Sequence, residues 1–139
     1  MPRKLYSYKL KRCVPLLTEA EFKSMVPQIK NYRNAIRHWK FDPQRRRQAV
    51  QGLDSEEEIV LLESYQAFRS AEERVLDAYE KIAGERLDHP EQVLEARLAY
   101  FGRLCPKCAR PFRTPRARFC AECGYALPDG EVAGPISET

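Results

Sequence analysis

The chain has 139 residues, 43% of them hydrophobic, which is enough for one folded domain with a small appendage. Its 24 Lys and Arg exceed its 20 Asp and Glu, so the formal net charge is +4. The longest apolar run, Ile59-Val60-Leu61-Leu62, is too short to span a membrane, and the start MPRKLYSYKLKR lacks the apolar core of a secretory signal. We therefore expect a cytoplasmic protein without a membrane partner, in which cysteines stay reduced.

Charge is unevenly distributed along the chain. Residues 1–51 carry 13 basic and 3 acidic side chains, residues 52–104 carry 6 and 13, and residues 105–139 carry 5 and 4. Two interpretations are open: the first two segments pack side by side and neutralise each other, or they form two partner surfaces of opposite sign.

Residues 5–14, LYSYKLKRCV, alternate between apolar and polar side chains, which predicts one half-buried β-strand. The inward positions are Tyr6, Tyr8, Leu10 and Val14; the outward ones include Ser7, Lys9 and Lys11. Cys13 lies on the polar face, where we expect an inert thiol. Because a lone strand leaves its backbone groups unpaired, either the cysteine-rich segment or another protein must supply a partner strand.

Helix-start signals follow directly. Thr18 and Glu21 have the spacing of a capping box, and Leu17 and Phe22 that of a hydrophobic staple. Pro27 interrupts the pattern, so we predict a short helix and then a second over about residues 27–40, with Ile29, Tyr32, Ile36 and Trp39 inward. Asp42-Pro43 predicts a short basic helix through Arg45-Arg46-Arg47 to Val50.

The longest predicted helix begins at Asp54-Ser55, where Glu58 completes a second capping box, and ends at Gly84. Its inward positions are Leu61, Tyr65, Phe68, Val75, Tyr79 and Ile82. This length is unusual, so the helix either runs unbroken or breaks near Ser70. A last helix opens at Asp88-His89-Pro90, turns Leu94, Leu98 and Phe101 inward and closes at Gly102. No internal repeat is predicted.

Four of the five cysteines lie in the stretch CPKCARPFRTPRARFCAECG, residues 105–124. Cys105 and Cys108 form one CxxC motif, Cys120 and Cys123 form another, and eleven residues separate them. Each motif lets two thiolates of a tight turn face one ion, and two such turns give the four tetrahedral sulfurs that Zn²⁺ prefers. We therefore predict one structural zinc ion bound by Cys105, Cys108, Cys120 and Cys123.

Residues 104–127 resemble the four-cysteine zinc-ribbon family. FCAECGYAL, residues 119–127, matches the second half of short ribbons, and CPKCARPF matches the first half except that Ala109 replaces the usual glycine. The resemblance implies a short β-hairpin between the two cysteine turns. Glycine there allows a left-handed backbone, and an alanine in that state costs roughly 1–2 kcal/mol, so we expect a first turn that is either slightly strained or differently shaped.

Other chemistries fit the sequence less well. A redox CxxC would need a βαβ setting, iron-binding rubredoxins space their two cysteine turns farther apart, and a catalytic zinc needs an open ligand position. His38 and His89 belong to no recognisable catalytic constellation, and no phosphate-cradling, dinucleotide or hydrolase motif is present. We therefore expect no enzymatic activity and no small-molecule substrate.

The ribbon arginines allow two interpretations. Arg110, Arg113, Arg116 and Arg118 with Phe112 and Phe119 either contact nucleic acid or offset the charge of the metal site, while the phenylalanines pack the hairpin. For Arg45–Arg47 the two interpretations are a phosphate contact and a solvated or acid-pairing helix face.

These observations predict a mainly α fold: an N-terminal strand and helical body over residues 1–102, a zinc-ribbon β-hairpin module over residues 103–127, and a polar tail over residues 128–139. We expect a protein-binding function. In size and charge segregation the chain is similar to bacterial immunity proteins, which implies that the acidic face of residues 54–95 or the basic face of residues 30–47 blocks a toxin. The alternative is a nucleic-acid-binding regulator that uses Arg45–Arg47 and the ribbon arginines.

Overall fold

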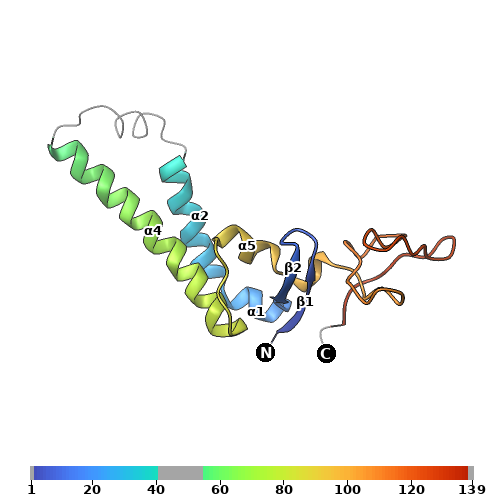
Figure 1. Ribbon diagram of the computed structural model, residues 1–139. Helices are drawn as coiled ribbons and strands as arrows, with labels where there is room; N and C mark the ends of the chain where they lie inside the picture. The colour runs from blue at the N-terminus through green and yellow to red at the C-terminus, as the bar shows by residue number, and fades with distance from the viewer. Residues whose placement is uncertain (1, 41–54, 138–139) are drawn as a thin grey trace.

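The computed structural model describes the backbone of residues 2–40 and 55–137, and the side chains of residues 2–37 and 65–137. The described part consists of a β-hairpin, several helices and a C-terminal segment without long strands (Figure 1). The basic helix predicted around Arg45–Arg47 lies outside the described residues, as do the side chains of Trp39 and of the Ser55–Glu58 capping box. None of the described helices is long and apolar enough to cross a bilayer.

The N-terminal strand prediction was wrong, because residues 5–14 contain a turn rather than one continuous strand. Strands β1 (Arg3–Ser7) and β2 (Arg12–Leu16) pair antiparallel, with Ser7 opposite Arg12 and Arg3 opposite Leu16. Lys11 adopts a left-handed φ of 56° in the turn, and the Ser7 hydroxyl accepts a hydrogen bond from the Leu10 amide at 3.3 Å. Ser7 is therefore buried instead of facing solvent, and each strand has its partner within the hairpin.

Two helices follow in the predicted places. Helix α1 (Glu19–Ser24) begins with the predicted capping box: the Thr18 hydroxyl accepts from the Glu21 amide, and the Glu21 carboxylate accepts from the Thr18 amide. Helix α2 (Val26–Lys40) starts beside Pro27, and its predicted inward residues Ile29 and Tyr32 are buried.

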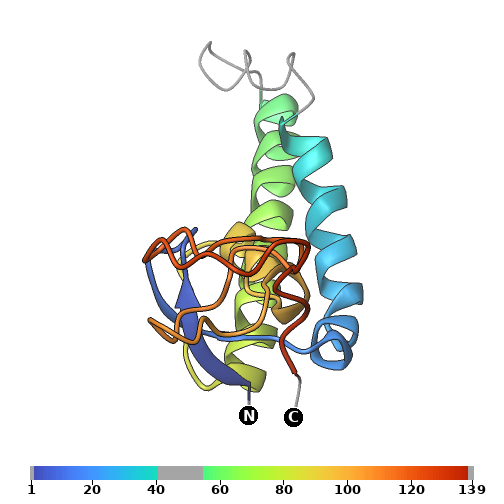
Figure 2. The same ribbon diagram turned by 90° about the vertical axis from the view of Figure 1, so that its right-hand side faces the viewer.

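The long helix α4 (Ser55–Ala83) runs without a break and ends at Gly84, whose φ is 81°. It lies beside α2 in an antiparallel pair that extends away from the rest of the molecule (Figures 1 and 2). The C-terminal half of α4 contributes Ala71, Val75 and Tyr79 to the core. Tyr65, which was predicted to face inward, is 44% exposed. The Tyr79 hydroxyl donates a buried hydrogen bond of 2.6 Å to the Pro15 carbonyl, which joins α4 to the hairpin.

The last helix is shorter than predicted. Helix α5 (Pro90–Glu95) stops where residues 96–98 extend beside Leu17: the Leu17 amide donates to the Ala96 carbonyl, and the Leu98 amide to the Leu17 carbonyl. A 3₁₀ turn η1 (Leu98–Tyr100) follows, and Leu98 and Phe101 are buried as predicted. The backbone pairing at Leu17 competes with helix continuation, and periodicity in the sequence does not reveal it.

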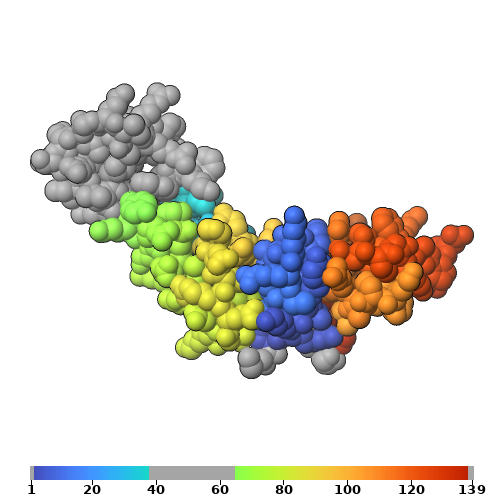
Figure 3. All heavy atoms as spheres, viewed as in Figure 1, coloured from blue at the N-terminus to red at the C-terminus, as the bar shows by residue number. Residues whose placement is uncertain are grey.

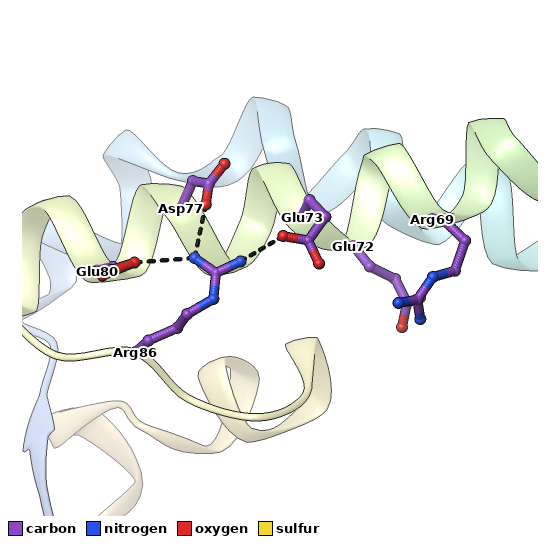
Figure 4. A network of polar contacts seen from close by, with 6 residues as sticks. All are labelled: Arg69, Glu72, Glu73, Asp77, Glu80 and Arg86. Carbon is purple, nitrogen blue, oxygen red and sulfur yellow. Dashed lines mark hydrogen bonds and ion pairs between the residues drawn. The ribbon is translucent and has the colours of Figure 1, made fainter.

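Ion pairs connect the basic and acidic segments. Lys4 in the hairpin pairs with Glu85 at 3.0 Å, and Lys9 pairs with Glu95 at 2.6 Å. On α4, three carboxylates surround the single guanidinium of Arg86 from the following loop (Figure 4): Glu73, Asp77 and Glu80. The pairs of Lys4 and Lys9 support the neutralising interpretation of the uneven charge, since they join the basic segment to the acidic one. The Arg86 pairs lie within the acidic segment.

The C-terminal segment returns to the body after residue 127. Ala133 and Ile136 are buried, and Pro135 forms an isolated β-bridge with Gly102. The Ala133 amide donates to the Ala117 carbonyl, and the Gly134 amide to the Pro115 carbonyl. Residues predicted as a polar tail thus contribute apolar side chains to both hydrophobic clusters.

Candidate metal centre

The four predicted ligands come together at one point. The Sγ atoms of Cys105, Cys108, Cys120 and Cys123 all lie within 4.8 Å of one another. The Cys105–Cys123 and Cys108–Cys120 sulfur pairs are 3.7 Å and 3.6 Å apart, and none of these cysteines forms a disulfide. The four cysteines are therefore positioned to bind a metal ion.

The two cysteine turns have the same hydrogen-bond pattern. In the first, the Ala109 amide donates to the Cys105 carbonyl at 2.9 Å; in the second, the Gly124 amide donates to the Cys120 carbonyl at 2.7 Å. The amide of each leading cysteine donates to the carbonyl of the residue five positions later, Arg110 or Tyr125. Each turn therefore holds its two thiols on the same side of a closed backbone loop.

This equivalence extends over an internal repeat that the sequence analysis missed. We call residues 103–112, RLCPKCARPF, the first knuckle and residues 118–127, RFCAECGYAL, the second knuckle. Each contains one isolated β-bridge at the matching place: Leu104 with Pro111, and Phe119 with Ala126. Each also ends on a buried apolar residue whose amide donates to the arginine carbonyl at its start. A comparison of the chain with itself at an offset of 15 residues would have shown this repeat.

The backbone strain predicted at Ala109 is present. Ala109 has a φ of 64°, and Gly124, at the same place in the second knuckle, has a φ of 81°. Both values lie in the left-handed region, which an alanine enters only at a free-energy cost of roughly 1–2 kcal/mol.

The hairpin expected between the cysteine turns is not formed as a ladder in the described structure. Among residues 103–137, only isolated bridges occur. Three prolines at positions 106, 111 and 115 lack amide donors, which removes hydrogen bonds that a ladder would need. Turns and the returning segment around Ala133 hold the two knuckles together instead.

The donor set fits zinc. A tetrahedron with Zn–S bonds of about 2.3 Å has sulfur–sulfur edges of about 3.8 Å, close to the two separations in this cluster. The leading cysteine of each knuckle, Cys105 and Cys120, is buried, and the second cysteine of each is half-buried. Four thiolates fill a tetrahedral shell, so the centre has no position for a substrate or a reactive water.

The thiols strongly affect one another's ionisation. Burial acts to raise the pKa of Cys105, but hydrogen bonds from the amides of Cys108 and Lys107 outweigh it and lower that pKa. The hydrogen bond from the Arg110 amide acts to lower the pKa of Cys108. Burial and the neighbouring thiols of Cys120 and Cys123 outweigh it and raise that pKa. A first thiolate thus disfavours further ionisation nearby, and a bound cation would remove that repulsion.

Two ribbon arginines contact the hairpin. The Arg110 guanidinium lies 4.1 Å from the centre of the Tyr6 ring, and that of Arg113 lies 4.5 Å from the Tyr8 ring. Glu122 of the second knuckle pairs with both arginines, at 3.6 Å and 3.1 Å. This role was not among the predicted ones, because the facing tyrosines are about one hundred residues away in the sequence.

The remaining candidates lie apart from the metal cluster. Cys13 is exposed in β2, and His89 caps the N-terminus of α5. Phe112 is fully buried, which fits the interpretation that the phenylalanines pack the ribbon, whereas Phe119 is 59% exposed and does not fit it. Arg116 and Arg118 are also exposed. The side chain of His38 and residues Arg45–Arg47 fall outside what the structure describes.

Comparison with protein-family models, with curated proteins and with solved structures gives no match to this chain.

Proposed function

We propose that this chain is a non-enzymatic protein-binding protein whose two knuckles are held together by one structural zinc ion. The observation that carries the proposal is the closed set of four cysteine sulfurs, which leaves no ligand position for catalysis. In the described part of the chain, no other group of metal-ligating side chains has the geometry to hold an ion.

The docking of the knuckles on the body supports a structural role for the metal. The first knuckle contacts the hairpin through Arg110, and Arg113, directly after this knuckle, contacts it as well. The returning segment buries Ile136 in the core of the body. So small a unit has little hydrophobic core of its own, so the metal supplies much of its folding free energy. In this proposal the zinc ion holds the two knuckles in a fixed arrangement, and the surface that they form binds the partner protein.

The partner class that we propose is a protein of complementary charge, as for inhibitors of the immunity type. On α4, the acidic group around Arg86 keeps an excess of carboxylates, three against one guanidinium. At the start of the second knuckle, Arg118 is an exposed cation, and so is Arg116 two residues before it. The acidic surface would attract a basic region of a partner protein, and the arginines would attract an acidic one.

The test is an affinity purification of the tagged protein from the cells that express it, with nuclease treatment and metal analysis. We expect a nuclease-resistant protein partner and one zinc per chain. The purified partner should then bind the purified chain in calorimetry. Failure to recover any protein partner would contradict the proposal.

A nucleic-acid-binding regulator is the second candidate, favoured by the exposed Phe119 beside Arg118. Stacking on an aromatic ring combined with phosphate contacts is typical of single-strand binding. Since Arg110 and Arg113 already contact the hairpin tyrosines, this function would rest on the other two ribbon arginines and on Arg45–Arg47. It predicts binding that weakens steeply with salt and disappears with nuclease treatment.

A further inference from the structure

The two knuckles differ in how far their equivalent bridge pairs are covered. In the first knuckle, Leu104 is half-buried and Pro111 is buried. In the second, Phe119 is 59% exposed and Ala126 is exposed as well. Two surfaces with the same backbone construction are thus covered in one case and open in the other.

The hairpin contacts the part of the chain that contains the covered bridge pair. It lies between the helices and the cysteine-rich segment, with both on its flanks (Figure 3). Tyr6 and Tyr8 meet the two arginines that flank the first bridge pair, Arg110 and Arg113. The first bridge pair is therefore shielded from solvent in a region where a neighbouring segment contacts arginines close to that pair in sequence.

The second knuckle has cations around its open bridge pair. Arg116 and Arg118 are exposed, and no ion pair with an acidic residue is found for them within the part of the chain that the structure describes. Glu122, the acidic residue of this knuckle, pairs with Arg110 and Arg113 on the side of the hairpin. The open surface is therefore apolar at Phe119 and positive around it.

We propose that the second-knuckle face, defined as Arg116, Arg118, Phe119 and Ala126, binds an acidic segment of a partner protein that also supplies an apolar side chain. The apolar side chain covers Phe119, and the acidic side chains pair with the two arginines. Aromatic and arginine side chains together are typical of energetically dominant interface positions. This inference rests on the proposed protein-binding function and identifies the surface responsible.

The experiment uses the zinc-loaded full chain and a displayed library of random 12-residue peptides as the probe. We expect the selected peptides to contain acidic residues together with a large apolar residue. Their affinity should fall at least tenfold for Phe119→Ala and for Arg118→Glu. The matched control is Arg103→Glu, because Arg103 is exposed at the equivalent position of the first knuckle, and it should change the affinity less than twofold.

Each variant is checked for zinc content and for an unchanged circular dichroism spectrum, and Phe119→Leu serves as a milder replacement if Phe119→Ala loses metal. Selection of no peptide, of peptides without acidic residues, or of peptides equally sensitive to Arg103→Glu would overturn the inference. Binding of a 20-nucleotide single strand that Phe119→Ala abolishes would also overturn it and assign the face to nucleic acid. If peptides bind elsewhere, or if none binds while the affinity purification still yields a protein partner, the proposed function stands and only this face is wrong.

Discussion

Ala109 and Gly124 occupy the same left-handed backbone position, each one residue after the second cysteine of a knuckle, with φ values of 64° and 81°. The two residues differ by one methyl group in otherwise matching turns. A Cβ added at Gly124 would meet no atom within 4 Å. The cost of an alanine at this position therefore comes from the backbone conformation and not from a steric clash.

Exchanging these residues should change metal affinity in opposite directions. Ala109→Gly should relieve strain and stabilise the holo form by up to about 1 kcal/mol, and Gly124→Ala should destabilise it by about 1–2 kcal/mol. Because metal binding and folding are coupled in such a unit, the effects should appear in zinc competition with a chelator, at about tenfold per 1.4 kcal/mol. Equal effects of the same sign would contradict the equivalence of the two positions.

Removal of a ligand should separate the knuckles from the body. Cys105→Ser or Cys123→Ser should release the metal and unfold residues 103–127, while most of the helical circular dichroism signal remains, since α2 and α4 pack against each other. The exposed Cys13→Ser is the matched control and should retain one zinc per chain. Loss of the whole helical signal in the ligand variants would show that the cysteine unit is integral to the core.

Gly102 was expected to end the last helix, but in the structure it allows close packing between segments. A Cβ at this position would lie 2.6 Å from the Thr114 carbonyl oxygen and 2.9 Å from the Phe112 Cβ. Gly102→Ala should therefore destabilise the chain by about 1–3 kcal/mol in urea unfolding. An unchanged unfolding midpoint for Gly102→Ala would contradict the tight packing.

Tyr79 should make stability fall at alkaline pH. Burial raises its pKa above the ordinary value of 10.0, so the folded chain retains a proton that the unfolded chain loses. The stability from this group is fully present below about pH 10 and declines at higher pH by about 1.4 kcal/mol per pH unit.

Tyr79→Phe should remove this contribution to the slope. At neutral pH it should also destabilise the chain by about 1–3 kcal/mol, because the Pro15 carbonyl loses its buried donor. Urea unfolding between pH 8 and pH 11 measures both effects, with the exposed Tyr65→Phe as control. An identical slope in wild type and Tyr79→Phe would contradict the assignment.

Several elements followed from local sequence signals alone. The capping box at Thr18, the helix start beside Pro27 and the end of α4 at Gly84 depend on residues a few positions apart. The clustering of the four cysteines also follows from local spacing. The left-handed Ala109 was expected from the resemblance to zinc ribbons, in which a glycine usually occupies this position.

Other features depend on contacts between distant segments. The alternation over residues 5–14 does not show where the chain turns, and α5 ends early because Leu17 pairs with residues 96–98. The roles of Arg110 and Arg113 depend on Tyr6 and Tyr8. Local sequence determined which residues could cap helices and gather around a metal. Only the tertiary structure decided which knuckle is covered, because backbone pairing and side-chain packing bring together residues whose separation along the chain no local pattern records.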